Sequence, residues 1–319
     1  MNMSIDVIVP VYGKWTVTAS CLQHLQQQTV EHRVILVDDA SPDDTLARVR
    51  AEFPDVDVIE MGKNSGFAAA CNAGINAGSA DIVVLVNNDV NAASNMLELL
   101  AQPFESQDQL GSTVPLLLGV DGTVDAYGLS ADRTMAGFVR FHGAPVASVS
   151  ATEPQLLGPY GAVAAYRRAA VSSVGGLDEG IFMYGEELDL ALRLRNGGWG
   201  VVAVPEARGI HVGGATTGKD SPKQRYLAGF GRGYLLRAYG VMNSPRLALR
   251  AFATEVIVCL VRLVTSKDLA SLKGRLAGWH AGGSAERRRR PVTGIDPSIG
   301  FIESLRMRSN DYWVRKNAK

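Results

Sequence analysis

Short β-branched runs and helix-like segments alternate through the first hundred residues, and this alternation restricts the fold more than any other feature. The β-branched runs occupy residues 5–11, 33–38, 56–60 and 81–86, and the helix-like segments occupy about 15–28, 42–52 and 66–78. Continuous apolar strands that alternate with helices predict an α/β domain with a mostly parallel sheet covered on both faces. In such sheets, ligands bind beyond the carboxyl ends of the strands.

Polar or aromatic side chains follow three of these four predicted strands at the point where each strand ends. They are Tyr12 after the first strand, Asp38 and Asp39 after the second, and Asn87, Asn88 and Asp89 after the fourth. These strand ends are therefore the first place to look for a functional site.

The stretch VDDASPDDT after the second strand combines a helix start with two carboxylates that the helix does not need. We predict Ser41 as the N-cap, Pro42 at the first helical position and Asp44 closing a capping-box-like pair. Asp38 and Asp39 are adjacent and repel each other, and capping does not require them. For Asp38 we favour an acceptor that binds the imide N–H of uracil or thymine, or ribose hydroxyls.

A loop with Asn64 and Gly66 precedes an alanine-rich helix in the stretch GKNSGFAAACNAGINAG. Small side chains allow this helix to lie close to the sheet or close to a ligand, and the residues alone favour neither alternative. The stretch contains neither G-x-G-x-x-G nor the P-loop G-K-[ST], so the usual dinucleotide and nucleoside triphosphate fingerprints are absent.

In the stretch VLVNNDVNAA, Asn87 and Asp89 lie two residues apart. Side chains at i and i+2 of an extended chain point the same way, so both oxygens can converge on one hard cation. Mg or Mn suits such ligands, especially when a diphosphate supplies the others. A polar turn followed by a helix cap explains the same residues equally well.

The stretch YGEELDLALRLR begins a helix with Glu186, Glu187 and Asp189. Acidic side chains in a first turn favour the helix dipole, and Asp189 can pair with Arg193. These effects do not explain both glutamates, so one of them is a candidate general base. His211 follows a later predicted strand and can complete the ligand set of a cation, although a lone histidine is more often structural.

Bulk properties exclude some classes of protein. The formal net charge is zero, which argues against a dedicated nucleic-acid binder. The three cysteines lack metal-ligand or redox spacing, and the apolar run near the N-terminus is too short for a signal peptide. No apolar run reaches the roughly 20 residues of a spanning helix. We therefore expect a soluble or peripheral protein of the cytoplasm.

Several fragments, in this order, resemble the family-two glycosyltransferases with the GT-A fold, over residues 4–215. VIVPVYGKWTVTASCLQHLQQQ looks like the opening strand and helix of that family, and ILVDDASPDDT resembles its nucleotide-binding VDNGSxDxT. NSGFAAACNAGI resembles the loop NxGFaaaxNxGi, and LVNNDV is similar to the LLNPDxx form of the D-x-D metal motif. GPYGAVAAYRRAAVSSVGGLDEGIFMYGEELDLALRLRNGGW looks like the acceptor-side segment, and IHVGGATTG resembles the closing xHxxgxSxG.

The resemblance implies an inverting, metal-dependent transfer from a nucleotide-diphospho-sugar, in a subgroup dominated by rhamnosyltransferase-like enzymes of cell-wall and surface polysaccharide assembly. It implies a Mg or Mn ion, and an acceptor that is a glycan or a polyprenyl-diphosphate-linked glycan. The nucleotide-sugar would be bound by Pro10, Tyr12, Asp38, Asp39, Asn64, Gly66 and Asn88. The metal would be held by Asp89, with Asn87 and His211, and the base would come from Glu187, Glu186 or Asp189.

Two departures from the family pattern affect these roles. The family usually has Glu-Asp where this chain has Glu186-Glu187, so the base falls on Glu187 with one extra methylene group. Asn87 is a neutral ligand, so metal binding is expected to be weak until the diphosphate adds its own charge.

The resemblance divides the chain into a GT-A domain, residues 1–220, and a helical, basic extension, residues 221–319. Residues 1–102 would bind the nucleotide-sugar, and residues 103–220, where we expect short strands and long loops, would bind the acceptor. Within the extension, residues 246–264 interleave arginines with apolar side chains. An amphipathic helix on the inner face of the cell membrane explains this pattern, and a helix packed on the domain or on a partner in a homodimer explains it equally well.

Two other functions also follow from the sequence. A non-catalytic relative would bind nucleotide-sugar or glycan without turnover, which Asn87 and Glu187 suggest. A nucleotidyltransferase on a similar sheet would consume nucleoside triphosphate, but the missing glycine-rich phosphate loop disfavours it.

Overall fold

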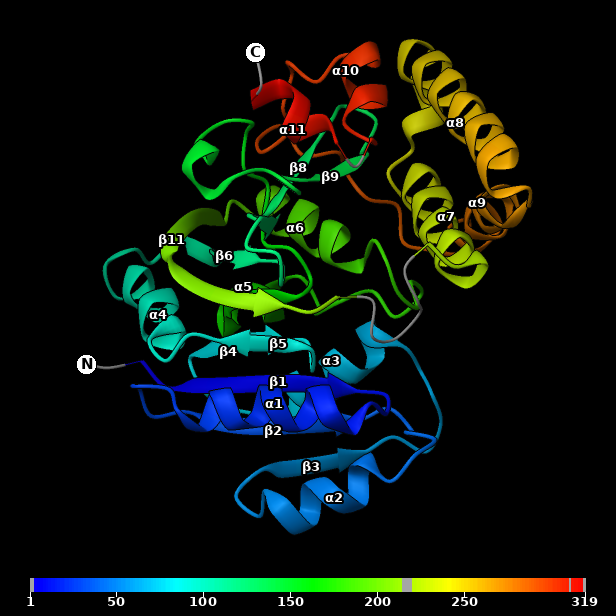
Figure 1. Ribbon diagram of the computed structural model, residues 1–319. Helices are drawn as coiled ribbons and strands as arrows, with labels where there is room; N and C mark the ends of the chain where they lie inside the picture. Colours follow the sequence, from blue (N-terminus) through cyan, green and yellow to red (C-terminus); the bar gives the residue numbers. More distant parts are fainter. Residues whose placement is uncertain (1–2, 214–219, 310, 318–319) are drawn as a thin grey trace.

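A computed structural model describes residues 3–213, 220–309 and 311–317 (Figure 1). These residues form a nine-stranded mixed sheet of order β3-β2-β1-β4-β10-β6-β11-β5, with β7 paired to β6, and a separate hairpin. Its strands are β1 (Ile5–Val11), β2 (Arg33–Asp38), β3 (Asp57–Glu60), β4 (Ile82–Val86), β5 (Val90–Ala92), β6 (Leu110–Leu118), β7 (Val124–Ala126), β10 (Val163–Arg167) and β11 (Gly200–His211). The hairpin pairs β8 (Leu129–Ala131) with β9 (Gly137–Val139).

The first four strands run parallel, as the alternating pattern predicts. The helices between them are α1 (Trp15–Gln26), α2 (Thr45–Glu52) and α3 (Phe67–Ala77), close to their predicted ranges. The predicted start of α2 is wrong. The helix begins at Thr45, and the Ser41 hydroxyl instead accepts the Gly13 N–H at 2.6 Å. Asp43 links the loop to the helix start by accepting the N–H groups of Lys14 and Thr45.

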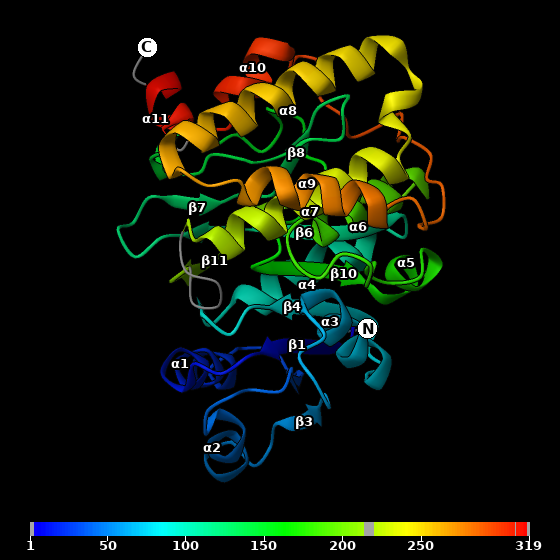
Figure 2. The same cartoon turned by 90° about the vertical axis from the view of Figure 1, so that its right-hand side faces the viewer.

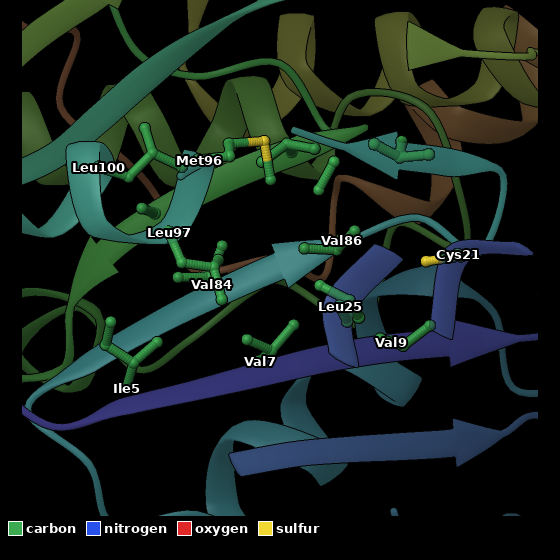
Figure 3. Packing of buried hydrophobic residues seen from close by; sticks show 14 of the residues in the cluster. Ile5, Val7, Val9, Cys21, Leu25, Val84, Val86, Met96, Leu97 and Leu100 are labelled. Atoms are coloured by element: carbon green, nitrogen blue, oxygen red, sulfur yellow. The ribbon is translucent and has the colours of Figure 1, made fainter. Parts of the chain in front are cut away.

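Apolar side chains on alternate positions of the buried strands separate the core into two layers. On one face, α1 and α4 (Met96–Ser106) cover β1 and β4, as the labelled side chains of Figure 3 show. On the other face, α3, α5 (Arg168–Ser173) and α6 (Glu186–Asn196) contribute small and aliphatic side chains. The buried Val, Ile and Leu residues of β4 face both layers, because a central parallel strand is covered on both sides.

The second half of the sheet contains strands of both directions. β10 runs antiparallel to β4 and β6, and β6 pairs in parallel with β11. β11 continues through a register shift to His211, well beyond the predicted strand GVVAVP. α4 extends past residue 103 into a segment where we expected strands and loops, and it contains Pro103.

The C-terminal region, residues 221–319, is helical as expected and packs on residues 103–220. Its helices are α7 (Pro222–Ala238), α8 (Pro245–Ser266), α9 (Ala270–Ala281), α10 (Phe301–Arg306) and α11 (Tyr312–Asn317). Leu235 and Tyr239 share an apolar cluster with Leu188 of α6, and the Trp313 ring packs 4.6 Å from the Phe141 ring. Among the described helices, none is both long enough and apolar enough to cross a membrane.

Candidate active site

The parallel strands β1, β2 and β4 bring their polar ends to one edge of the sheet (Figures 1 and 3). Val11 is paired with Asp38, so Tyr12 lies beside the end of β2. Pro10 and Tyr12 are half-buried. The sequence-predicted residues of the first two strand ends therefore lie together in the structure.

Asp38 is buried and retains an unsatisfied acceptor. Its Oδ2 accepts the Ser41 N–H at 3.2 Å, while Oδ1 has no hydrogen-bond partner among the described residues. A buried carboxylate oxygen without a donor is unfavourable, so a ligand N–H or O–H would stabilise it. This chemistry fits a nucleobase imide or a sugar hydroxyl.

The neighbouring Asp39 braces the loop that carries Asn64. Its Oδ1 accepts the Ser65 N–H at 2.6 Å, and its Oδ2 accepts the Gly66 N–H at 2.9 Å. Gly66 has φ 91°, and a Cβ there would lie 2.5 Å from the Phe182 carbonyl oxygen, so this position requires glycine. Asn64 is exposed on the braced loop.

Asn88 has a similar bracing role at the end of β4. Its Nδ2 donates to the Thr18 hydroxyl at 2.8 Å and to the Gly13 carbonyl at 3.3 Å. These bonds fix the β1–α1 turn relative to the Asn87–Asp89 segment. A direct nucleotide contact by Asn88 or Asp39 stays a prediction, since both side chains already hold backbone in place.

His211 lies between two carboxylates that come from different strands. Its Nε2 is 3.3 Å from Asp89 Oδ1, because His211 of β11 pairs with Val90 of β5. Its Nδ1 is 2.8 Å from Asp125 Oδ2 on β7. Burial opposes the charged imidazolium, but the hydrogen bonds to Asp125 and Asp89 outweigh it and raise the pKa of His211 to about 9.

These residues fit a divalent cation whose remaining ligands come from elsewhere. Two adjacent ligands of an octahedral ion lie about 3.0 Å apart, near the Asp89–His211 separation. Asp125 is placed to accept the Nδ1 proton and leave Nε2 free to ligate, as partners of metal-bound histidines do. Within the described residues, no group of three or more His, Cys, Asp or Glu side chains is arranged to hold a metal. Asn87 is half-buried nearby.

The N-terminus of α6 places two carboxyl groups next to each other. Gly185, with φ 117°, turns the chain so that Glu186 points into the core and Glu187 remains half-buried. Burial and repulsion by Glu187 raise the pKa of Glu186 well above its usual range, and Oε2 of Glu186 has no hydrogen-bond partner in the part of the chain that the structure describes. Burial also raises the pKa of Glu187, while the Gly185 N–H donates to its Oε2 at 3.1 Å.

Asp189 is fully occupied by structural contacts. Its Oδ2 accepts from Arg193 at 2.7 Å, the pairing that the sequence predicts. Its Oδ1 accepts from the Tyr239 hydroxyl at 2.9 Å and from Arg288. The helix that carries the two glutamates is therefore attached to the C-terminal region through Asp189.

The segment Tyr160–Ala162 contacts both the carboxyl pair and the region of the Asp89–His211 pair. A Cβ on Gly161 would lie 3.8 Å from the Glu187 carboxyl carbon, so this glycine lies directly beside Glu187. The Ala162 carbonyl accepts the Asn87 N–H at 2.9 Å, and the Tyr160 ring lies 6.5 Å edge-on from the His211 ring. The structure thus brings the end of β4 and the start of α6 next to the same short segment.

Comparison with known proteins identifies the family. Residues 6–175 match the family described as Glycosyl transferase family 2, and residues 92–275 match Glycosyl transferase family group 2. The chain belongs to glycosyl transferase family 2. It is a glycosyltransferase, and the nucleotidyltransferase alternative is thereby wrong.

A relative of this glycosyltransferase is the N-acetylglucosaminyl-diphospho-decaprenol L-rhamnosyltransferase of Mycobacterium tuberculosis. The two are 29% identical over 214 residues, which cover 59% of this chain and 68% of the relative. The match agrees with the rhamnosyltransferase-like resemblance of the sequence fragments.

Two solved structures show the same fold at low identity. GalNAc-T7, with UDP, GalNAc and Mn2+, has a TM-score of 0.56 at 15% identity, over 75% of this chain and 51% of that one. The mannosyltransferase PcManGT from Pyrobaculum calidifontis, with GDP-Man and Mn2+, has a TM-score of 0.55 at 17% identity, over 100% of this chain and 87% of that one. The expected GT-A fold is confirmed.

The structure adds residues that the sequence did not indicate. Asp125 lies on a short strand in the weakly periodic middle of this glycosyltransferase, and only the pairing of β6 with β7 brings it to His211. Arg288, in the basic run near residue 290, reaches Asp178 and Asp189. Of the closing fragment IHVGGATTG, residues 214–218 lie outside the described residues.

Proposed function

We propose that this glycosyltransferase moves a sugar from a nucleotide-diphospho-sugar to an acceptor hydroxyl by a single inverting displacement that depends on Mg or Mn. One observation carries the proposal: the segment Tyr160–Ala162 borders both Glu187 of the carboxyl pair and His211 of the Asp89–His211 pair. In-line displacement at an anomeric carbon requires a base on one side of that carbon and a stabilised leaving group on the other.

Glu187 is the base in this proposal. Burial raises the pKa of both carboxyl groups, and it does so more strongly for Glu186, the more buried of the two, so Glu186 takes up a proton before Glu187 does. Glu187 takes the proton of the acceptor hydroxyl as that oxygen bonds to the anomeric carbon, and the bond from this carbon to the diphosphate oxygen breaks. Asp189 does not act as a base, because Arg193, Tyr239 and Arg288 occupy its oxygens.

In this proposal, residues 1–102 bind the nucleotide of the donor. The free Oδ1 of Asp38 accepts a base imide or ribose hydroxyl beside Pro10 and Tyr12. Asp89 and His211, with Asn87, are the residues that would hold the cation. When bound, the cation supplies positive charge that stabilises the departing diphosphate.

The donor that we propose is dTDP-rhamnose, and the acceptor is a glycan carried on a polyprenyl diphosphate during cell-wall or surface polysaccharide synthesis. The support is the similarity to the mycobacterial relative, whose name states L-rhamnosyl transfer to N-acetylglucosaminyl-diphospho-decaprenol. Such an acceptor places the reaction at the cytoplasmic face of a membrane.

The test is a donor screen with the purified full chain. Nucleoside diphosphate release is measured for dTDP-rhamnose and a panel of UDP-, GDP- and dTDP-sugars, with Mn or Mg and an N-acetylglucosaminyl-diphosphate lipid analogue. We expect dTDP-rhamnose to give the fastest release and a chelator to stop it. Faster release from another donor would refute the rhamnose assignment, and binding of donor without any turnover would indicate the non-catalytic alternative.

A further inference from the structure

Helix α8 is oriented with its apolar side toward solvent. The side chains that it buries are Ala251, Thr254 and Glu255. Its outer face instead exposes Leu249 (73%), Phe252 (62%), Leu260 (56%) and Val264 (75%), with Val256, Ile257, Val261 and Leu263 between them. A surface helix normally buries its apolar stripe, so this arrangement requires an explanation.

Charged side chains fix α8 in this orientation. Glu255 faces inward, where it accepts from Arg232 of α7 and from Arg275 of α9 at 2.7 Å each. Arg250 also faces inward and donates to Asp132 at 2.7 Å. Arg262 pairs with Asp220 at 3.3 Å. The inward ion pairs therefore leave the outer face of α8 without charge over about four turns.

Helix α9 extends the exposed apolar surface. Leu269, Leu272 and Leu276, just before and within α9, are 45%, 39% and 63% exposed. α9 is held against α7 at backbone contact, since a Cβ on Gly274 or Gly278 would lie 2.0 or 1.9 Å from carbonyl oxygens of α7. We refer to the outer face formed by these side chains of α8 and α9 as the apolar helical face.

The apolar helical face lies on the side of the molecule where the parallel strands end. In Figure 1 the strand arrows of β1 and β2 point toward the side that carries α7, α8 and α9. In Figure 2, which views that side directly, α8 and α9 run across the front, above the strands of the nucleotide-binding half. Helices α8 and α9 and the ends of the parallel strands that carry the candidate active site therefore lie on one side of the protein.

Basic side chains surround the apolar helical face. Arg246, Lys267 and Lys273 are exposed and form no ion pair with the described residues. Residues 245–281 contain six Lys or Arg against two acidic residues, and both acidic side chains are neutralised by arginines. Long basic side chains can lie along an apolar surface while their charges reach anionic head groups.

An arginine-lined cavity of about 480 Å3 adjoins the turn that leads into α8. Arg237, which stacks on Trp279 with 5.0 Å between the guanidinium carbon and the ring centre, lines it together with Arg287, Arg289 and Arg290. None of these four arginines forms an ion pair with a residue that the structure describes. Guanidinium groups without carboxylate partners are suited to bind phosphate.

We propose that the apolar helical face docks on the surface of an anionic lipid bilayer, with α8 and α9 lying in the interface plane. An apolar face with flanking lysines and arginines is the pattern of interfacial helices, which lie on a membrane without spanning it. A second copy of the chain is a poorer occupant. A symmetric dimer pairs this face with itself, so the uncompensated cations Arg246, Lys267 and Lys273 of each copy would meet a surface that is also basic.

The test is vesicle flotation of the purified full chain, which requires neither donor nor acceptor and is thus independent of the proposed function. Vesicles of phosphatidylcholine alone are compared with vesicles that also contain phosphatidylglycerol. We expect binding to the anionic vesicles that high salt weakens, and Phe252→Ser/Leu260→Ser/Val264→Ser should reduce it by about tenfold or more. Val120→Ser is the matched control, because Val120 is 76% exposed on the β6–β7 turn, outside the apolar helical face.

A charge variant keeps the test decisive if the triple variant does not fold. Lys267→Glu/Lys273→Glu should lower binding to anionic vesicles by about tenfold or more at low salt while leaving the thermal unfolding curve unchanged. No flotation of the wild-type chain with either vesicle would overturn the proposal. A dimer in light scattering that the triple variant abolishes, without vesicle binding, would assign the face to a second copy and also overturn it.

Discussion

The two regions of this chain have opposite charge and opposite use of apolar side chains. Residues 1–220 contain 26 acidic and 13 basic side chains, whereas residues 221–319 contain 6 acidic and 19 basic ones. In the first region, helices such as α1 and α4 bury their apolar side chains against the sheet. In the second region, α8 exposes them. The formal net charge of zero is therefore a cancellation between an acidic region with the candidate chemistry and a basic region suited to an anionic surface.

The largest expected effect comes from Glu187→Gln, which tests whether the acidic region carries the chemistry. The amide cannot accept the acceptor proton, so we expect transfer to fall by about 1000-fold, within the range for loss of a general base. Donor affinity should remain within about twofold, because Glu187 does not contact the nucleotide in our proposal. Turnover and donor binding are measured separately, with the exposed Glu206→Gln as control. Wild-type turnover in Glu187→Gln would refute the assignment of the base.

Asp125→Ala tests whether the acidic region holds a cation through His211, the side chain that Asp125 contacts. Loss of the 2.8 Å contact removes the group that orients His211, so manganese affinity in the presence of nucleoside diphosphate should fall by about 10- to 100-fold. Titration calorimetry measures this affinity. Asp121→Ala, an exposed position on the same hairpin, is the control. Equal manganese affinity in the Asp125 variant and in the wild type would refute the assignment of His211 as a cation ligand.

Gly231→Ala tests whether the two regions depend on each other mechanically. A Cβ at this position of α7 would lie 1.9 Å from the Tyr184 carbonyl oxygen, just before α6. Overpacking against backbone should destabilise the fold by about 3 kcal/mol and displace the Glu186–Glu187 turn, so turnover should fall as well. Thermal unfolding and turnover are compared with Gly300→Ala, where a Cβ meets no atom within 4 Å. Unchanged stability and turnover would mean that α7 and the turn are not coupled.

The smallest effect concerns acid stability of the basic region. Burial opposes ionisation of Glu255, but Arg232, Arg275 and Arg308 outweigh it and lower its pKa to about 2. A pKa lowered on folding contributes stability that is fully present above the unfolded value of about 4.5 and is lost as pH falls toward about 2. At about 1.4 kcal/mol per pKa unit, this contribution is at most about 3 kcal/mol.

Denaturant unfolding of the wild type and of Glu255→Gln measures the stability that ionised Glu255 contributes. The difference between the two should be largest near neutral pH and shrink between about pH 4.5 and about pH 2. Glu303→Gln, a partly exposed glutamate of α10, serves as the control. A difference that does not change across this pH range would mean that the arginines do not hold Glu255 ionised.

The sequence predicted the fold of residues 1–102 closely, because its signals are local. Each β-branched run between turn residues became a strand, and the strand ends carry the predicted polar residues. The start of α2 was wrong because Ser41 and Asp43 hydrogen-bond to the β1–α1 turn, which lies about 30 residues away in sequence. α4 was missed in part because Pro103 interrupts the helical pattern in the sequence.

The sequence did not predict contacts between residues that are far apart along the chain. Asp125 meets His211 across 86 residues, and nothing around Asp125 marks it as a partner of a histidine. The helical pattern of residues 246–264 was visible, but its outward orientation depends on the arginines of α7 and α9 that surround Glu255. The roles of Glu187, Asp38 and Asp89 remain predictions that rest on the family resemblance and on the geometry described above.

The contact between Gly231 and Tyr184 has a consequence for local unfolding. Because no side chain separates α7 from the turn before α6, the turn has no free volume in which to move while α7 stays in place. Opening of the Glu186–Glu187 turn then requires that α7 shift, and α7 is itself held against α9 by glycine contacts. We therefore expect the turn and these two helices to open together as one unit, so that the carboxyl pair persists as long as the helices behind it.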